Sequence, residues 1–244
     1  REGQTIASRA RIICQELEDL SQFATLTSEQ IAGEIRIGCF SPLSPVVLPS
    51  LLQYFTEHHP DLRIQTLEGA PHELEQSLVT GALDAVLAYS RHLSPGFHLE
   101  KLATTRLFAL LPATHPHATR DSITFPELEG ENLILLDMVP ISSLVPGLLE
   151  QYNVSPIPTY RSSNVETVRA LVARGLGYSV MAIPPLDHGS ESHRTVAIPI
   201  RSDYPRGHMI IAMNSGTNIS ARMREVVIQC RRIFAEYEGL SLDG

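Results

Sequence analysis

Hydrophobic residues near the start of the chain recur at spacings of three and four. The seam consists of Ile6, Ala10, Ile13, Leu17, Leu20 and Ala24. This spacing predicts an amphipathic helix over residues 5–25. Two interpretations stay open: the helix packs on its own domain, or it stands apart and pairs with a second chain. Residues 26–33 are polar, end in glycine and are typical of a linker, so we assign residues 1–32 to a linker or dimerisation helix.

After this segment, short apolar runs alternate with amphipathic stretches. We expect strands over residues 34–40, 62–67 and 84–89, separated by helices over 45–59 and 71–81. Strands that alternate with helices in this way are typical of a parallel sheet with right-handed crossovers. At the start of the first helix, Ser44 is the expected N-cap and Pro45 the first helical residue. Pro49 is expected to bend this helix.

A second round of the same pattern occupies the rest of the chain. We expect strands over 106–111, 133–137, 158–161, 177–183 and 208–213, and helices that end near Tyr152, Gly175 and residue 238. Ser163 and Glu166 have the spacing of a capping box, which predicts a helix start at this point. Two successive rounds predict an α/β protein with two lobes.

The composition of the chain limits the classes of function that it can have. Of 244 residues, 43% are hydrophobic and 19% are charged, which is typical of a globular protein with a sizeable core. A net charge of −8 argues against this segment binding a phosphate backbone. Cys14, Cys39 and Cys230 are odd in number and far apart, which favours a reducing compartment and a cytoplasmic location. We find neither a secretory signal nor an apolar run long enough to span a membrane.

The sequence offers little for catalysis or for cofactors. It has no nucleophile elbow, no dinucleotide-binding glycine motif and no phosphate-binding loop. Asp137 ends a predicted strand, but a lone carboxylate without a base or metal favours a structural role. The pairs His58–His59 and His115/His117 lack the i, i+4 spacing of a helical zinc site. We therefore expect neither an enzyme, nor a metal site, nor a bound cofactor.

Ligands of parallel α/β sheets bind where loops leave the carboxyl ends of strands. Four such loops are expected, at residues 40–44, 68–71, 138–143 and 162–164. Hydroxyl groups beside free N–H groups at a helix start suit a carboxylate, to which the helix dipole contributes about 0.3–1 kcal/mol. The alternative is that Ser44, Ser143 and Ser163 only cap their own helices.

The ordered set of these segments resembles a LysR-type transcriptional regulator that lacks its N-terminal winged helix-turn-helix. The segments that carry the resemblance are Gly33–Gly38, Leu48–Phe55, His59–Ile64, Leu78–Ala85, Leu111–Pro116 and Val165–Gly177. The resemblance implies a type 2 periplasmic-binding-protein fold, with two Rossmann-like lobes joined by two crossover strands. Lobe I would comprise residues 33–105 with 214–244, and lobe II residues 106–213.

The resemblance also implies a small-molecule effector, commonly a small carboxylate, an amino acid or an aromatic acid, held in a cleft between the lobes. The implied effector-binding residues are Ser41, Pro42, Leu43, Ser44, Gly69, Ala70, Pro71, His72, Tyr89, Ile141, Ser142, Ser162, Ser163 and Asn164. Pro42 departs from the family pattern because proline cannot donate a backbone hydrogen bond. Arg161 adjoins one loop, but no Lys or Arg lies inside these loops, so a polyanion is not expected.

The implied partners are a second copy of the chain, as a homodimer or homotetramer, and promoter DNA, which would bind the absent N-terminal domain. Two rival interpretations remain at this point. A solute-binding protein of a transport system would share the architecture, but it needs export and has no use for a heptad helix. An enzyme on the same scaffold would need a convergent acid and base pair, which the sequence does not suggest.

Overall fold

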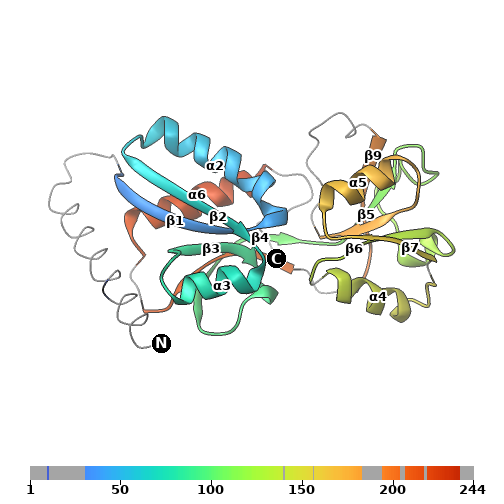
Figure 1. Ribbon diagram of the computed structural model, residues 1–244. Helices are drawn as coiled ribbons and strands as arrows, with labels where there is room; N and C mark the ends of the chain where they lie inside the picture. The colour runs from blue at the N-terminus through green and yellow to red at the C-terminus, as the bar shows by residue number, and fades with distance from the viewer. Residues whose placement is uncertain are drawn as a thin grey trace. The chain divides into compact units, whose positions relative to one another are not determined.

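A computed structural model describes residue 10 and residues 31–139, 141–155, 157–182, 194–203, 207–216 and 219–236 (Figure 1). The expected leading helix over 5–25, apart from residue 10, and residues 26–30 of the expected linker lie outside the described residues. The chain divides into two compact units, with crossings after Thr104 and after Gly207. Unit 1 holds the described residues before the first crossing and after the second, and unit 2 holds those between them.

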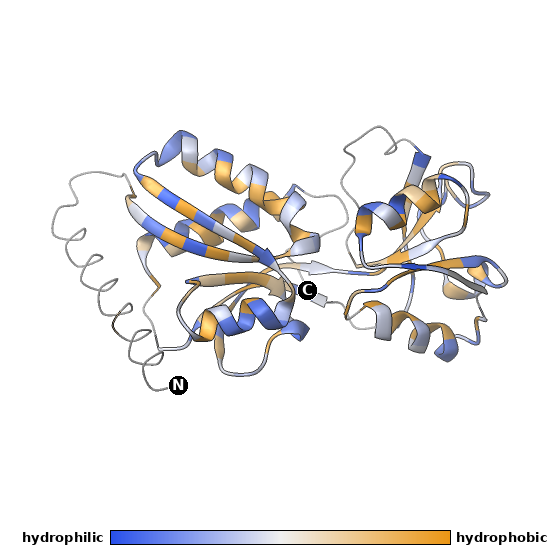
Figure 2. Cartoon of the chain, viewed as in Figure 1, coloured by the Kyte–Doolittle hydropathy of each residue, from blue (hydrophilic) through white to orange (hydrophobic). Residues whose placement is uncertain are grey.

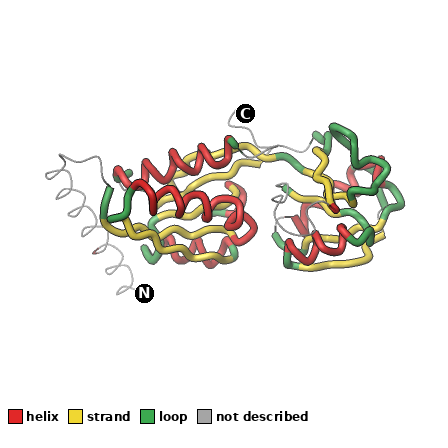
Figure 3. Tube along the Cα trace, turned by 90° about the horizontal axis from the view of Figure 1, so that it is seen from above, coloured by secondary structure: helices red, strands yellow, loops and turns green. Residues whose placement is uncertain are grey.

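Unit 1 is built on a five-stranded sheet in the order β2-β1-β3-β10-β4. The strands are β1 (Gly33–Phe40), β2 (Leu62–Gly69), β3 (Ala85–Tyr89), β4 (Phe97–Thr105) and β10 (Gly207–Asn214). β1 lies between β2 and β3 and is parallel to both, whereas β10 is antiparallel to β3. Figure 3 shows these strands side by side. The expected parallel sheet is therefore present, with an antiparallel strand added to it.

Three helices cover this sheet: α2 (Ser44–His58), α3 (Pro71–Val79) and α6 (Ala221–Ala235). The chain steps from β1 to β2 in one direction and from β2 past β1 to β3 in the other. Right-handed crossovers therefore place α2 and α3 on opposite faces of the sheet (Figure 1). In α2, Val47, Leu51 and Phe55 recur every four residues and are at most 1% exposed. Figure 2 shows the corresponding apolar and polar sides of this helix.

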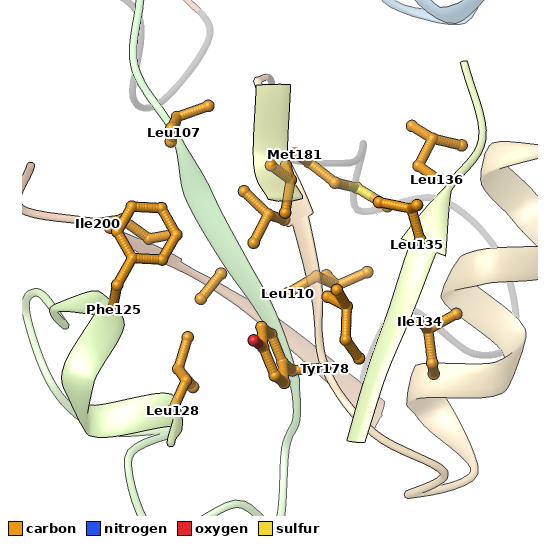
Figure 4. Packing of buried hydrophobic residues seen from close by; sticks show 14 of the residues in the cluster. Leu107, Leu110, Phe125, Leu128, Ile134, Leu135, Leu136, Tyr178, Met181 and Ile200 are labelled. Atoms are coloured by element: carbon orange, nitrogen blue, oxygen red, sulfur yellow. The ribbon is translucent and has the colours of Figure 1, made fainter. Parts of the chain in front are cut away.

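Unit 2 contains a three-stranded antiparallel sheet in the order β8-β5-β9 and a parallel pair, β6 and β7. The strands are β5 (Phe108–Pro112), β6 (Asn132–Leu136), β7 (Ile157–Ser162), β8 (Ser179–Met181) and β9 (Thr195–Pro199), and the helices are α4 (Ile141–Gln151) and α5 (Val165–Ala173). A parallel bridge between Leu133 and Tyr178 connects β6 to the start of β8. Figure 4 shows Tyr178 within the apolar core of this unit, together with Phe125 and Leu128.

The connection between β6 and β8 depends on one glycine. Gly177 has φ 152°, and a Cβ atom at this position would lie 2.2 Å from the carbonyl oxygen of Asn132. The next residue, Tyr178, donates its backbone N–H to that same oxygen over 2.9 Å. The close approach of the two backbones therefore requires a residue without a side chain.

Two strands were not predicted and one was assigned to the wrong lobe. β4 and β9 were missed because the exposed first half of β4 and the largely half-buried β9 lack a continuous apolar run. The expected strand 208–213 exists as β10, but it pairs with β3 in unit 1. The expected limit of lobe II at residue 213 is therefore wrong. Among the described helices, none is both long and apolar enough to cross a membrane.

Candidate functional site

The sheet of unit 1 brings the ends of several strands to one edge. The parallel strands β1, β2 and β3 end there, at Phe40, Gly69 and Tyr89. β10 is antiparallel and starts at the same edge, since Met209 pairs with Tyr89. We name this region the carboxyl edge of unit 1. Ligands of α/β sheets bind at such edges, because the loops that leave the strands provide adaptable polar groups there.

The loop after β1 contacts the loop after β2 at this edge. The exposed Ser41 donates a hydrogen bond from Oγ to the carbonyl oxygen of Gly69 over 3.4 Å. Pro42 is half-buried, and Leu43 is 1% exposed and anchors the loop in the core. The Leu43 side chain therefore serves packing, and Ser41 is the member of this loop whose hydroxyl solutes can reach.

Ser44 does not cap α2, so this expectation is wrong. A 3-10 turn at Ser41–Leu43 leads directly into the helix, which makes Leu43 the N-cap and Ser44 the first helical residue, with φ −55° and ψ −48°. Ser44 is 4% exposed, and its hydroxyl has no hydrogen-bond partner among the described residues. The Cys39 thiol lies near enough to interact with Ser44, but a thiol is only a weak hydrogen-bonding group.

The start of α3 is already occupied by a carboxylate of the chain itself. Ala70 is the N-cap, and its backbone N–H donates to Oε2 of Glu73 over 3.2 Å. Pro71 follows as the first helical residue, and His72 is exposed. Because Glu73 provides negative charge at this helix start, an acid group of a ligand is disfavoured here.

An aromatic cluster lies beside these loops. The rings of Phe40 and His92 are 4.7 Å apart, those of Tyr89 and His92 are 5.2 Å apart, and all pairs meet edge to face. Burial lowers the pKa of His92 to about 4. Tyr89 was expected at the site, but His92 was missed. It follows β3 by three residues with no periodicity to mark it, and only the tertiary structure brings it next to Phe40.

In unit 2, the loops after β6 and β7 leave the same end of a parallel pair. The backbone N–H of Asp137 donates to the carbonyl oxygen of Ser162 over 2.8 Å. Oγ of Ser162 accepts from the backbone N–H of Asn164 over 3.2 Å. Asn164 then accepts from the N–H of Thr167 over 3.0 Å and is the N-cap of α5. The expected capping box of Ser163 is therefore wrong, and Ser163 lies exposed one residue before the cap.

The loop that precedes α4 is shorter than expected. The helix begins at Ile141, which is 7% exposed and packs into the core of unit 2. Ser142 is half-buried, and its backbone N–H donates to the carbonyl oxygen of Met138 over 2.9 Å. Ser143 is the third residue of the helix and therefore does not cap it.

The residues considered for metal or acid–base chemistry have structural surroundings. His58 stacks on Tyr54 at 4.4 Å, and His115 pairs with Glu131 at 3.0 Å. Asp84, which begins the third predicted strand, binds Arg36 through both side-chain oxygens. In the part of the chain that the structure describes, no group of three His, Cys, Asp or Glu side chains could hold a metal ion.

The two described cysteines are buried free thiols. Cys39 in β1 and Cys230 in α6 are both 0% exposed. Burial raises the pKa of Cys39 to about 12 and raises that of Cys230 as well. Thiols react as thiolates, so both side chains are poorly suited to redox chemistry in the folded state.

Comparisons with known proteins agree with this architecture. OxyR, a DNA-binding transcriptional dual regulator of Escherichia coli K12, is 24% identical over 228 residues, covering 92% of this chain and 74% of OxyR. The hydrogen peroxide-inducible genes activator of Dickeya chrysanthemi is 23% identical over 232 residues, covering 94% of this chain and 75% of that protein. The structure of HinK, a LysR family transcriptional regulator of Pseudomonas aeruginosa, matches with a TM-score of 0.75 and 26% identity, covering 95% of this chain and 80% of HinK. The model of the LysR substrate binding domain matches residues 28–235. The chain thus belongs to the LysR substrate-binding domain family and has its effector-sensing, type 2 periplasmic-binding-protein-like fold.

Proposed function

We propose that the chain is the sensing part of a cytoplasmic LysR-type transcriptional regulator, and that it binds one small acidic effector. The observation that carries this proposal is the carboxyl edge of unit 1, where Ser41, Tyr89 and the loop at Gly69 follow neighbouring parallel strands. In unit 2, Ser162, Ser163 and Asn164 form the corresponding loop before α5. Effector binding would shift the populations of two conformations and so control promoter DNA binding by a separate N-terminal domain.

The exposed serines Ser41 in unit 1 and Ser163 in unit 2 are each better suited to an acid group than the start of α3. Glu73 already provides a carboxylate at α3, whereas Ser41 and Ser163 are exposed hydroxyls beside helix starts. Ser44 was expected to contribute, but its burial favours a packing role. At the start of α5, Asn164 provides a neutral cap that accepts the N–H of Thr167, and the first-turn carboxylate of Glu166 pairs with Arg169.

The effector is expected to differ from that of the relatives named for hydrogen peroxide. A peroxide sensor that works through a thiol needs an accessible thiolate. The two cysteines that the structure describes, Cys39 and Cys230, are buried and have raised pKa values, which favours a reversibly bound metabolite over peroxide chemistry at these thiols. Assembly as a homodimer or homotetramer belongs to the same proposal. The solute-binding alternative is not favoured, because the relatives are transcriptional regulators.

A ligand screen by thermal denaturation tests the proposal. Small carboxylates at 100 times their Kd should stabilise the chain by about 2.7 kcal/mol, through binding to the folded state alone. Ser41→Ala and Ser163→Ala together should remove the rise in Tm. Ser50→Ala is the matched control, since Ser50 is an exposed serine of α2. A rise that the double variant leaves intact would place the ligand elsewhere, and no rise with any acid would refute the proposed effector class.

A further inference from the structure

Among the described residues, several buried polar atoms without a hydrogen-bond partner lie toward the carboxyl edge of unit 1. Such atoms are found on Ser44, His92, Thr104 and His208. Ser44 follows β1 and His92 follows β3, whereas Thr104 lies at the end of β4 and His208 at the start of β10. Four separate segments therefore bring unsatisfied polar groups to the region where the effector is proposed to bind.

Thr104 and His208 lie on neighbouring strands. Ser215, which follows β10, donates to the carbonyl oxygen of Gly96, which precedes β4, over 2.7 Å. A Cβ atom on Gly207 would lie 3.1 Å from Cγ2 of Thr105. The start of one strand thus meets the end of the other, and Thr104 is placed across from His208. Thr104 is 3% exposed, so its hydroxyl is removed from bulk water without a partner that replaces it.

His92 is the most unusual of these residues, because both of its ring nitrogens are buried and have no hydrogen-bond partner in the part of the chain that the structure describes. Phe40 and Tyr89 contact its ring edge to face and provide no conventional acceptor or donor through their rings. Buried polar groups in native proteins nearly always have a partner, and an unmade hydrogen bond destabilises the fold. This imidazole therefore has unused hydrogen-bonding capacity that none of the described residues satisfies.

We propose that His92 determines effector specificity by hydrogen bonding to a neutral polar group, a hydroxyl or an amide, on the bound effector. The apolar part of the same molecule would lie against the half-buried Tyr89. This inference rests on the proposed function, and it narrows the effector to a small acid that carries a hydroxyl or amide beside an apolar ring or chain.

The charge state of the imidazole supports a neutral partner. Burial keeps the pKa of His92 near 4, so the ring is uncharged at pH 7 and has one donor and one acceptor nitrogen. A hydroxyl or an amide can both donate and accept, and so matches either nitrogen. A carboxylate can only accept, and it would be held more strongly by the hydroxyls and backbone N–H groups already described.

The test compares acids that differ by one hydroxyl. Titration calorimetry at pH 7.5 would measure Kd for benzoate against its three monohydroxy isomers, and for butanoate against 2- and 3-hydroxybutanoate. We expect at least one hydroxy acid to bind tenfold or more tightly than its parent acid. His92→Phe should reduce this preference to less than twofold and leave the parent acid within threefold of its original Kd. His92→Gln, which keeps a donor and an acceptor, should retain part of the preference.

The outcomes separate this inference from the proposed function. Binding of the parent acids that Ser41→Ala and Ser163→Ala abolish, without any preference for a hydroxyl, would overturn the role of His92 alone. A preference that survives in His92→Phe would do the same. Absence of binding by every acid would overturn both proposals. Circular dichroism and Tm of the two His92 variants check that each is folded before its Kd is interpreted.

Discussion

Cys39 and Cys230 are expected to resist thiol reagents in the folded chain. The pKa of Cys39 is raised by burial from its ordinary value of 9.0 to about 12, which lowers the thiolate population about a thousandfold. A thiolate of higher pKa is also a better nucleophile, with a Brønsted coefficient of about 0.4–0.5, so the net effect on rate is on the order of 50-fold. The 0% exposure of Cys39 slows the reaction further.

Alkylation with iodoacetamide at pH 7.5, followed by peptide mapping, measures this difference for each cysteine separately. Mapping matters because Cys14 lies outside the described residues and is scored on its own peptide. The reference is a thiol introduced at an exposed position of α2, Ser50→Cys. Cys39 and Cys230 should react at least 50 times more slowly than this reference, and at ordinary rates once the chain is unfolded in guanidinium chloride.

A rate for Cys39 or Cys230 within tenfold of the surface reference would refute the reasoning. It would mean that the thiols reach solvent through openings of the fold, and that burial in the static structure does not protect them. The same mapping after exposure to hydrogen peroxide then tests the functional consequence. Sulfenic or disulfide products at either cysteine would return peroxide to the set of candidate effectors.

Four further changes test the local structure, each by urea denaturation. The Asp84 carboxylate accepts hydrogen bonds of 2.7 Å from the backbone N–H of Arg36 and of 2.7 Å from the Arg36 guanidinium. Asp84→Ala removes both and should lower the free energy of unfolding by about 2–4 kcal/mol, and Asp84→Asn should lower it less. Gly177→Ala forces a Cβ to 2.2 Å from Asn132 O and should cost more than about 2 kcal/mol, whereas Gly147→Ala, with no atom within 4 Å, should be neutral or stabilising. Asn164→Ala removes the N-cap of α5 and should lower the free energy of unfolding by about 1 kcal/mol, whereas Ser163→Ala should have no measurable effect. A larger loss of stability in Ser163→Ala than in Asn164→Ala would show that Ser163 is the cap. The pKa of His92 is about 4 in the folded chain against an ordinary 6.5, so the unfolded chain takes up the proton first as pH falls. Protonation of this residue should therefore lower the free energy of unfolding by about 3 kcal/mol between pH 6.5 and 4. His92→Phe should flatten this dependence of stability on pH.

The clearest strand in the sequence, β3, is one whose burial produces a continuous run of apolar residues. In β3, Ala85, Val86, Leu87 and Ala88 are all at most 1% exposed, because the strand is central and covered on both faces. β4 is buried only in its second half, so its sequence lacks such a run. The periodicity of apolar residues reports burial, and the buried half of β4 gives too short a pattern to be recognised.

Helix starts were harder to predict, for a different reason. The N-cap is fixed by the backbone angles of one residue, and those angles depend on the preceding turn. Leu43 takes the N-cap position of α2 because the 3-10 turn already has helical angles, with ψ −23° at Leu43. Asn164 takes precedence over Ser163 because the Ser162 hydroxyl accepts its N–H and places it at the turn. Serine and asparagine have similar capping preferences, so composition alone does not choose between neighbours.

These corrections bear directly on the candidate site. The strongest alternative to effector binding was that Ser44, Ser143 and Ser163 only cap their own helices, and none of the three occupies an N-cap. Capping therefore does not explain their presence. Ser44 is buried and serves packing, and Ser143 lies inside α4 rather than in the loop before it. Ser163 is left as an exposed hydroxyl one residue before Asn164, the neutral N-cap of α5, and Ser41 is an exposed hydroxyl two residues before Leu43, the N-cap of α2. An acidic effector is thus expected to depend on these two serines more than on any helix cap.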